Sequence, residues 1–482
     1  MSSSSGWPPR LTLLASGLLG FALRAHTVFT DDGINWPDEI YQSFEPAHRL
    51  VFGYGLQAWE YLEGARHWAT PAFVAGWLWL CRLVGADAPA TYIHLVKLVF
   101  SALSLLAAGG TYRLARTFGA QALPASLAAA TWSLCALALY FSPRAMSENL
   151  AAVALVWGLA LVFDEAAGRR GRLLGSGLLG LSVLFRLQSG VVCAVVLGVF
   201  AFRAWRTGAW RPFREVLAAL GVSALLFGAT DALAWHGLPG AKLGGAFHSA
   251  FVYWRVNIVE NRGASWGTSG ADYYFRHLFL TMPGVTLALL AGLLLSARRA
   301  WALVAVLVGF FALHFAVPHK ELRFLVPIMP AACAFIALGL TRLPPSLTRL
   351  GVAGVAVAVG ISAATAGALT MGDVGSYPER KQSSAWDDFG PINRLLLAAH
   401  AREDLCGLRV DAHLAWVGGS TYLHRPAPLY MPRTPVQTGH FNYVLTHPGS
   451  GAEVVAREGN WELVRLPRQD CTPDPGYSWR LP

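Results

Sequence analysis

Long apolar runs, separated by short polar or basic turns, recur along most of the chain. A membrane-spanning helix needs about 20 apolar residues, and most of these runs reach or approach that length. Two successive runs, 172–186 and 189–205, share so little sequence that we expect at least one to be short or broken. The pattern predicts eleven transmembrane helices, at residues 11–29, 92–114, 121–141, 148–166, 172–186, 189–205, 214–235, 281–297, 300–317, 322–341 and 347–371.

Arginine clusters in the turns between these runs predict the orientation of the helices. Basic residues next to membrane helices lie mostly in the cytoplasm. The clusters are Arg113/Arg116, Arg169/Arg170/Arg172, Arg203/Arg206/Arg211/Arg214, Arg298/Arg299 and Arg342/Arg349. If all are cytoplasmic, the N-terminus is cytoplasmic and the C-terminus is external. Two large loops, 30–91 and 236–280, are then external as well.

One further apolar segment, 70–85, does not fit this count as a crossing. A crossing there would move Arg113 and Arg116 to the external side. We therefore predict a juxtamembrane or re-entrant helix within the first external loop, with its tryptophans at the membrane interface.

From about residue 372 the apolar runs give way to proline, charge and period-2 alternation. The alternation at 442–446 and 461–465 predicts strands, and a helix is expected near 389–402. We thus expect a transmembrane domain at 1–371 and a small external α/β domain at 372–482. Cys406 and Cys471 lie in this second part and are expected to form a disulfide if the compartment is oxidising.

Composition agrees with an all-α polytopic membrane protein that carries this small extra domain. The chain of 482 residues is 54% hydrophobic and 14% charged, whereas ordinary soluble domains are about a quarter charged. The formal net charge of +10 fits membrane orientation, and no nucleic-acid-binding module is recognisable. The histidines lack metal-ligand spacing, so we expect no metal and no cofactor.

Residues 36–61, which follow the first apolar run, combine acids, amides, a histidine and aromatic residues in one short stretch. Pro37 suits a first helical turn, where the helix dipole favours ionised Asp38 and Glu39. Helical spacing would place Asp38, Gln42 and Glu45 on one face. Three more candidates for substrate contact follow, namely His48, Trp59 and Glu60. Pro-Asp-Glu by itself is usually no more than a helix start.

A second set of candidates is cationic or aromatic. His319, Lys320 and Arg323 stand at one end of a late apolar run, where they either bind an anion or reach toward the interface. Arg186 lies deep in an apolar run and should face a cavity or a charged partner. Trp266, Tyr273 and Tyr274 are either a platform for a bound ligand or ordinary interface aromatics. Arg144, Glu148 and Asn149 are either a structural ion pair with a polar helix start or part of a site.

Several of these stretches together resemble one enzyme family. Pro37-Asp38-Glu39 with the following Gln-Ser-x-Glu-x-Ala-His, the segment 142–149, the aromatic loop 261–275 and His319-Lys320-Glu321-Leu322-Arg323-Phe324 occur in the order found in that family. They resemble the dolichyl-phosphate-mannose-type mannosyltransferases of glycosyltransferase family 22, which elongate glycosylphosphatidylinositol anchors and lipid-linked glycans. The segment 185–189 departs from the family's Arg-Pro-Thr turn. The resemblance extends to about residue 340 and points to a bacterial homologue.

The resemblance implies a GT-C glycosyltransferase fold and a division of roles. Asp38 would be the base for the acceptor hydroxyl, with Glu39 orienting the base or the acceptor. His319, Lys320, Arg323 and Arg186 would neutralise the donor phosphate. Gln42, Glu45, His48, Trp59, Glu60, Trp266, Tyr273 and Tyr274 would contact the substrate.

The expected function is inverting transfer of a hexose, with mannose favoured, on the outer face of the membrane. The donor would be a polyprenyl- or dolichyl-phosphate sugar, and the acceptor a glycolipid or a lipid-linked glycan. The alternative is a polytopic transporter or flippase that binds lipid-phosphate sugars without transfer. Inverted repeats would favour that alternative, and none is recognisable. We expect a bacterial inner membrane rather than the endoplasmic reticulum.

Overall fold

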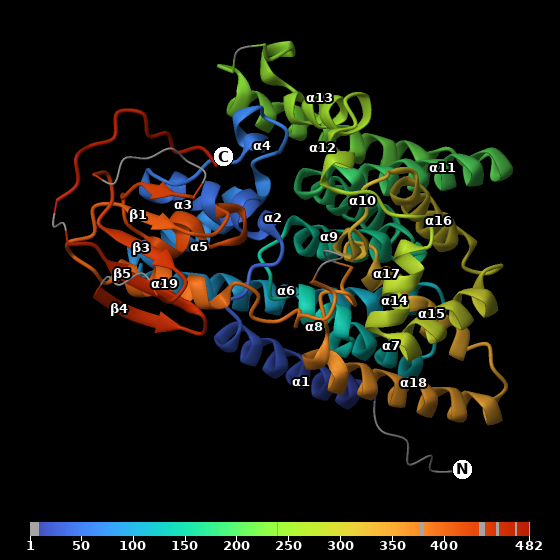
Figure 1. Ribbon diagram of the computed structural model, residues 1–482. Helices are drawn as coiled ribbons and strands as arrows, with labels where there is room; N and C mark the ends of the chain where they lie inside the picture. Colours follow the sequence, from blue (N-terminus) through green and yellow to red (C-terminus); the bar gives the residue numbers. More distant parts are fainter. Residues whose placement is uncertain are drawn as a thin grey trace. The chain divides into compact units, whose positions relative to one another are not determined.

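The computed structural model describes residues 9–238, 240–375, 380–432, 439–449, 453–467 and 470–481 (Figure 1). The chain forms two compact units, each built from two separate segments. The first unit contains Met1–Ala25 and Phe100–Ser383, and the second contains His26–Val99 and Ser384–Pro482. The segment 30–91, predicted to be the first external loop, therefore belongs with the C-terminal segment, whereas the expected boundary at residue 371 assigned it to the transmembrane domain.

Helices make up the first unit. Its helices are α7 (Ala122–Leu134), α8 (Ala136–Phe141), α9 (Ser147–Val162), α10 (Gly168–Phe185), α11 (Gly190–Thr207), α12 (Arg211–Trp235), α13 (His248–Trp254), α14 (Tyr273–Thr281), α15 (Pro283–Ser296), α16 (Trp301–Ala316), α17 (Met329–Leu340) and α18 (Pro345–Thr365). Two more helices, α1 (Pro9–Thr30) and α6 (Pro89–Thr117), continue from one unit into the other.

Each of the eleven predicted apolar runs contains a helix, but the helices differ in length. Within the described residues, five helices are long and apolar enough to cross a membrane. α9 and the segment Glu165–Phe185, which contains the short 3-10 helix η2 (Glu165–Ala167) and α10, form a pair bent by 75° that would count as a sixth. Four shorter apolar helices, α7, α15, α16 and α17, fall below that length. A polytopic membrane protein is confirmed, while the number of eleven crossings stays a prediction.

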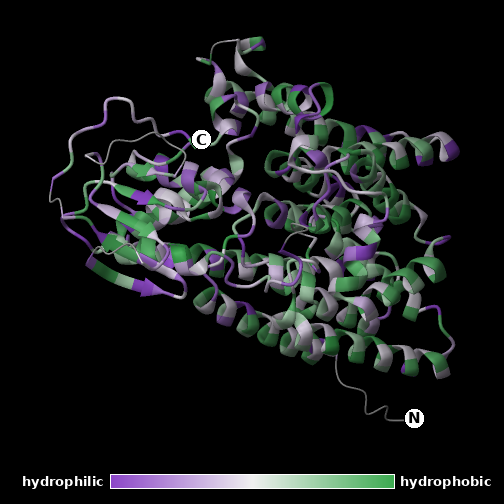
Figure 2. Cartoon of the chain, viewed as in Figure 1, coloured by the Kyte–Doolittle hydropathy of each residue, from purple (hydrophilic) through white to green (hydrophobic). Residues whose placement is uncertain are grey.

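Large apolar side chains cover the outside of the longest helices. α1, α12 and α18 are hydrophobic along most of their length (Figure 2). Their exposed residues include Leu18 on α1, Leu225 and Leu233 on α12, and Leu350 on α18. In water such surfaces would drive aggregation, so these faces are suited to contact lipid.

Close packing of α9 on α10 positions the most charged part of this unit. A Cβ atom added at Gly175 of α10 would lie 2.5 Å from the backbone nitrogen of Val162 and 2.8 Å from the carbonyl oxygen of Gly158, both on α9. Glycine at this position lets the two backbones touch, as small residues do between membrane helices. The first turn of α9 carries Glu148, and Arg186 follows directly after α10.

The second unit joins the segment 26–99 to the C-terminal sheet. Its elements are α2 (Pro37–Glu39), the π-helix η1 (Ile40–Phe44), α3 (Glu45–Phe52), α4 (Trp59–Leu62), α5 (Ala69–Leu83), α19 (Gly390–His400), α20 (Gly419–Leu423), β1 (Leu408–Val410), β2 (Leu429–Tyr430), β3 (Tyr443–Thr446), β4 (Glu453–Glu458) and β5 (Trp461–Arg465). The strand order is β2-β1-β3-β5-β4. β1 runs parallel to β2 and β3, and β5 runs antiparallel to β3 and β4.

Several predictions for this unit are confirmed. The expected strands at 442–446 and 461–465 are β3 and β5, and the expected helix near 389–402 is α19. Cys406 and Cys471 form a disulfide bond. The apolar segment 70–85 is the helix α5, which packs on α3 and is not among the candidate membrane spans. Its place at the membrane interface stays a prediction.

Candidate functional site

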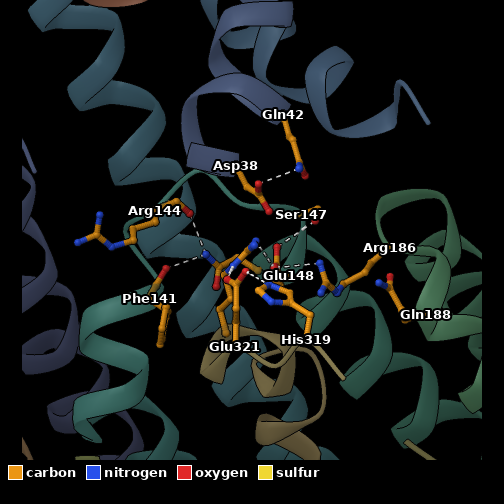
Figure 3. Close-up of polar contacts among 12 residues, drawn as sticks. Asp38, Gln42, Phe141, Arg144, Ser147, Glu148, Arg186, Gln188, His319 and Glu321 are labelled. Atoms are coloured by element: carbon orange, nitrogen blue, oxygen red, sulfur yellow. Dashed lines mark hydrogen bonds and ion pairs between the residues drawn. The ribbon is translucent and has the colours of Figure 1, made fainter. Parts of the chain in front are cut away.

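The predicted catalytic loop begins with a single α-helical turn that widens into a π-helix. Pro37 occupies the first helical position, as expected, and Asp38 stays partly exposed while Glu39 is fully buried. The Nε2 atom of Gln42 donates to Oδ1 of Asp38 across 2.8 Å (Figure 3) and to Oε1 of Glu60 across 2.7 Å. One amide thus holds two carboxylates in fixed positions.

Glu60 is the second carboxylate of this arrangement, and it lies on α4 beside the half-exposed Trp59. Burial raises the pKa of Glu60 to about 7, although Arg66 lowers it, and the charge of Asp38 adds to the rise. Near neutral pH this carboxyl group therefore changes between a charged and an uncharged state. The change occurs one hydrogen-bonded amide away from Asp38.

Glu45 does not share a face with Asp38 and Gln42, because the wider π turn breaks the 3.6-residue period between them. Its side chain is fully buried and accepts hydrogen bonds from the backbone N–H groups of Leu56 and Thr421, each across 2.6 Å, and from Oγ1 of Thr421 across 3.0 Å. Burial raises the pKa of Glu45 to about 7 despite these donors. Glu45 therefore fastens α20 to α3 within the second unit.

His48 is likewise held inside the second unit. Its Nδ1 lies 3.0 Å from the carbonyl oxygen of Tyr54, so Nδ1 carries the proton and Nε2 accepts from Nδ1 of His424 across 2.9 Å. Burial lowers the pKa of His48 to about 3 and that of His424 to about 4. The hydrogen bonds of Glu45 and His48 are thus made within the second unit, and contact of these two residues with the substrate stays a prediction.

The cationic candidates come together in the first unit around Glu148, at the start of α9 (Figure 3). Oε1 of Glu148 lies 2.9 Å from Nη1 of Arg186 and 2.8 Å from Nη1 of Arg323. All three side chains are at least 95% buried. Both guanidinium groups also lie over the ring of Phe324, 4.9 Å and 5.1 Å from its centroid. We call Glu148, Arg186, His319, Glu321 and Arg323 the charged cluster.

His319 and Glu321 complete the charged cluster. Oε1 of Glu321 lies 2.8 Å from Nε2 of His319, and Oε2 accepts from Nε of Arg323. Nδ1 of His319 lies 2.9 Å from the carbonyl oxygen of Gly267. Both ring nitrogens thus face acceptors, which favours the doubly protonated imidazolium.

The pKa values of this pair agree with that assignment. Burial alone would lower the pKa of His319, but Glu321 outweighs it and raises the pKa. Burial would raise the pKa of Glu321, but Arg323 and His319 outweigh it and lower the pKa to about 2. The charged cluster therefore has three cations against two carboxylates, and the excess positive charge can stabilise an anion.

Lys320 stands beside the charged cluster and bonds to backbone carbonyls. Its Nζ donates to the carbonyl oxygens of Val317 across 2.8 Å and Ser269 across 3.1 Å. Desolvation lowers the pKa of Lys320. This ammonium ties the loop around Ser269 to the end of α16 and contributes charge at longer range than the two arginines do.

The three aromatic candidates are placed differently from one another. Trp266 is 50% exposed, and its ring centroid lies 6.1 Å from that of His319. Tyr273 donates its hydroxyl to the carbonyl oxygen of Gly375 across 2.9 Å, and Tyr274 is fully buried. Trp266 is therefore the member of this set with an exposed ring next to the charged cluster.

The side chains of the segment around Glu148 are held by different partners. The guanidinium of Arg144 lies over the ring of Tyr140, 4.6 Å from its centroid, and Nδ2 of Asn149 donates to the carbonyl oxygens of Phe141 and Arg144. Glu148 instead forms ion pairs with Arg186 and Arg323. The sequence did not reveal that Glu148 connects these two arginines. In the described part of the chain no group of three or more His, Cys, Asp or Glu side chains could hold a metal ion, and we assign no metal ligands.

Comparison with known proteins identifies the family to which most of the chain is similar. A model described as the Alg9-like mannosyltransferase family matches residues 18–376. GPI mannosyltransferase 3 of Yarrowia lipolytica is 30% identical over 357 residues, which cover 70% of this chain and 63% of the relative. GPI mannosyltransferase 3 of Drosophila melanogaster is 25% identical over 333 residues, which cover 67% and 56%. The chain thus spans about 60% of the length of these relatives.

Solved structures share the fold at low sequence identity. ArnT from Cupriavidus metallidurans, bound to undecaprenyl phosphate, gives a TM-score of 0.63 at 14% identity, with 98% of this chain and 100% of that chain covered. The apo oligosaccharyltransferase of Archaeoglobus fulgidus gives 0.59 at 12% identity, with 93% and 70% covered. The predicted GT-C fold with a small C-terminal sheet is confirmed.

Proposed function

Because the chain belongs to the Alg9-like mannosyltransferase family, we propose that it is an inverting glycosyltransferase that moves a mannose from a polyprenyl- or dolichyl-phosphate donor. The acceptor is a glycolipid or a lipid-linked glycan. The names of the relatives, GPI mannosyltransferases, support mannose and a glycolipid acceptor. The undecaprenyl phosphate bound to ArnT supports a lipid phosphate as the carrier. So does the dolichol phosphate bound in a second structure of the Archaeoglobus fulgidus oligosaccharyltransferase.

The observation that carries this proposal is the charged cluster. In the transfer, the acceptor oxygen forms a bond to the anomeric carbon while the bond from that carbon to the phosphate oxygen breaks. Negative charge then collects on the departing phosphate. Arg186, Arg323 and His319 supply preorganised donors and excess positive charge for it, since Glu148 and Glu321 already hold them in place. Lys320 adds a cation at longer range.

We assign the base to Asp38. It is partly exposed, and Gln42 bonds its Oδ1 atom, so the carboxylate is both reachable and oriented. It takes the proton of the acceptor hydroxyl as the new glycosidic bond forms. Glu39 is fully buried and stays proposed to orient the base or the acceptor. The residues that stay proposed as surroundings of the substrate are Gln42, Glu45, His48, Trp59, Glu60, Trp266, Tyr273 and Tyr274.

The orientation of the chain is part of the same proposal. The arginine clusters support a cytoplasmic N-terminus and an external C-terminus. Transfer then takes place on the external face, in a bacterial inner membrane rather than the endoplasmic reticulum.

Replacing Asp38 by asparagine tests the proposal in the purified full-length protein. The assay follows radiolabelled mannose from dolichyl- or undecaprenyl-phosphate mannose into a lipid extract of the source cells. Asparagine keeps the oxygen that accepts from Gln42 but removes the base, so turnover should fall by at least about 10²-fold. Asp32→Asn is the matched control, because Asp32 is a partly exposed acid of the same loop that faces Arg394 at 3.6 Å.

The control should keep the parent's turnover, and both variants should bind the donor. Near-parental turnover in Asp38→Asn would remove Asp38 as the base. If the parent binds the donor, moves it across vesicle membranes and transfers no sugar, the transporter alternative replaces the enzyme.

A further inference from the structure

A cavity of about 460 Å³ lies in the first unit where the N-terminal ends of α10 and α12 come together. It is separate from the charged cluster, since Arg186 follows the opposite end of α10. The residues that line the cavity are Arg169, Leu173, Arg211, Arg214, Glu215 and Ala218.

Positive charge dominates this cavity. Glu215 accepts from Nη2 of Arg172 across 2.6 Å and from Nε of Arg211 across 3.0 Å, while Nε of Arg169 lies 3.9 Å away. The side chain of Glu215 is 11% exposed, whereas those of Arg169 and Arg211 are 68% and 77% exposed. The single carboxylate of Glu215 thus lies at the base of the cavity. The arginines around it carry more positive charge than this one carboxylate can neutralise.

Two helix dipoles add to this charge. α10 has 18 residues and begins at Gly168, and α12 has 25 residues and begins at Arg211. Their N-cap residues, Ala167 and Trp210, make no side-chain cap bond in the described structure. The positive ends of two long helices thus meet beside the arginines, where their dipoles attract anions; Asp164 caps the short turn that leads into α10.

Apolar surface continues from the cavity along both helices. Leu173 and Ala218 line it, and the neighbouring Leu174 and Leu217 are 59% and 46% exposed. α12 is a candidate membrane span, and α10 belongs to the bent pair. A ligand that fits both surfaces carries a phosphate and apolar chains on the same molecule.

We propose that this cavity binds the phosphate headgroup of an anionic membrane lipid. The arginines form charge-assisted hydrogen bonds to the phosphate oxygens, and the exposed leucines contact the acyl chains. The site is independent of sugar transfer, because the arginines that line it are not members of the charged cluster.

Native mass spectrometry of the purified full-length protein tests this site. The protein is incubated with equal amounts of phosphatidylglycerol and phosphatidylcholine, and the lipid that stays bound is measured. Phosphatidylglycerol should be retained preferentially. Each arginine beside an anionic headgroup contributes about a fivefold change in affinity, so Arg169→Gln with Arg214→Gln should weaken retention about 30-fold. Arg172 and Arg211, which make the short bonds to Glu215, stay in place.

The matched control is Arg298→Gln with Arg299→Gln, an exposed arginine pair in the turn before α16. It removes the same charge and should retain the lipid like the parent. Equal losses in the two double variants would overturn the site, because attraction would then depend on overall charge alone. Inorganic phosphate, added at the concentration of the lipid, should not displace the lipid. Complete displacement would overturn the assignment to a lipid.

Discussion

Replacing Arg323 by lysine tests whether the charged cluster receives the departing phosphate. Arg323 bonds two different carboxylates, Glu148 through Nη1 across 2.8 Å and Glu321 through Nε, and lies over Phe324. A lysine keeps the positive charge but presents one compact ammonium group instead of a planar fork. The substitution therefore separates charge from geometry.

The expected size of the effect follows from the bonds that are lost. A charge-assisted hydrogen bond contributes about 1.5–3 kcal/mol. If one such bond strengthens as the phosphate departs, its loss lowers turnover by about 10- to 150-fold. Apparent donor affinity should change less, because the charge that attracts the phosphate remains.

Arg24→Lys is the matched control, because Arg24 is also a fully buried arginine of the first unit. It donates to the carbonyl oxygens of Gly20 across 2.9 Å and Ser133 across 2.6 Å, and to the hydroxyl of Ser104 across 3.2 Å. Its loss should lower thermal stability without lowering turnover at temperatures where the protein stays folded. Single-turnover rates and unfolding temperatures are measured for both variants in the same detergent.

Two results would refute the assignment of Arg323. Turnover of Arg323→Lys within about twofold of the parent would show that its guanidinium contributes less than about 0.5 kcal/mol to the transition state. Equal losses of turnover in Arg323→Lys and Arg24→Lys at equal losses of stability would show that Arg323 acts through folding. In either case Arg186 would be the next candidate for the phosphate.

Three further predictions concern pH, topology and the disulfide. Burial holds the pKa of Glu60 at about 7. Turnover should therefore rise with pH around 7, as Glu60 ionises and adds negative charge near Asp38, and Glu60→Gln should remove that rise from the pH–rate profile. Because this folded pKa exceeds the ordinary 4.5, ionisation of Glu60 should also cost the parent stability as pH rises from 4.5 to 7, and Glu60→Gln should reduce that loss. Cysteines introduced at the exposed Ala88 and Lys242 should react with an impermeant thiol reagent from the same side of the membrane; opposite sides would make 70–85 a crossing. Reduction of Cys406–Cys471, which are 65 residues apart, should lower the unfolding free energy of the second unit by about 4 kcal/mol, and an unchanged unfolding temperature would contradict this.

The pattern of apolar runs predicted the helices well, because a membrane helix requires about 20 successive, mostly apolar residues. The pattern could not predict that each of the two compact units is built from two segments that are far apart in the sequence. Glu45 accepts a hydrogen bond from Thr421, 376 positions away in the sequence, and this contact helps to join the segment 26–99 to the C-terminal part of the second unit. A local pattern of polar and apolar residues contains no information about a hydrogen bond between residues so far apart. The π turn at Ile40–Phe44 was missed for a related reason, since one extra residue per turn leaves the local composition unchanged.

In the candidate site, too, single residues could be predicted from their local sequence, whereas their partners far away in the sequence could not. Arg186 was found as a cation deep in an apolar run and Arg323 as one of three cationic candidates at the end of another, but Glu148, which bonds both, lies 175 residues from Arg323. Electrostatics offers a signal that spacing does not, because a buried guanidinium requires a carboxylate or another anion near it. Two buried arginines therefore call for an acid at an apolar helix end, and Glu148 meets that condition. The same balance explains the chemistry we propose: with Glu148 shared between two arginines and Glu321 between Arg323 and His319, the cations are held in place without being neutralised. A phosphate that approaches the charged cluster meets oriented donors, and little reorganisation remains to be done in the transition state.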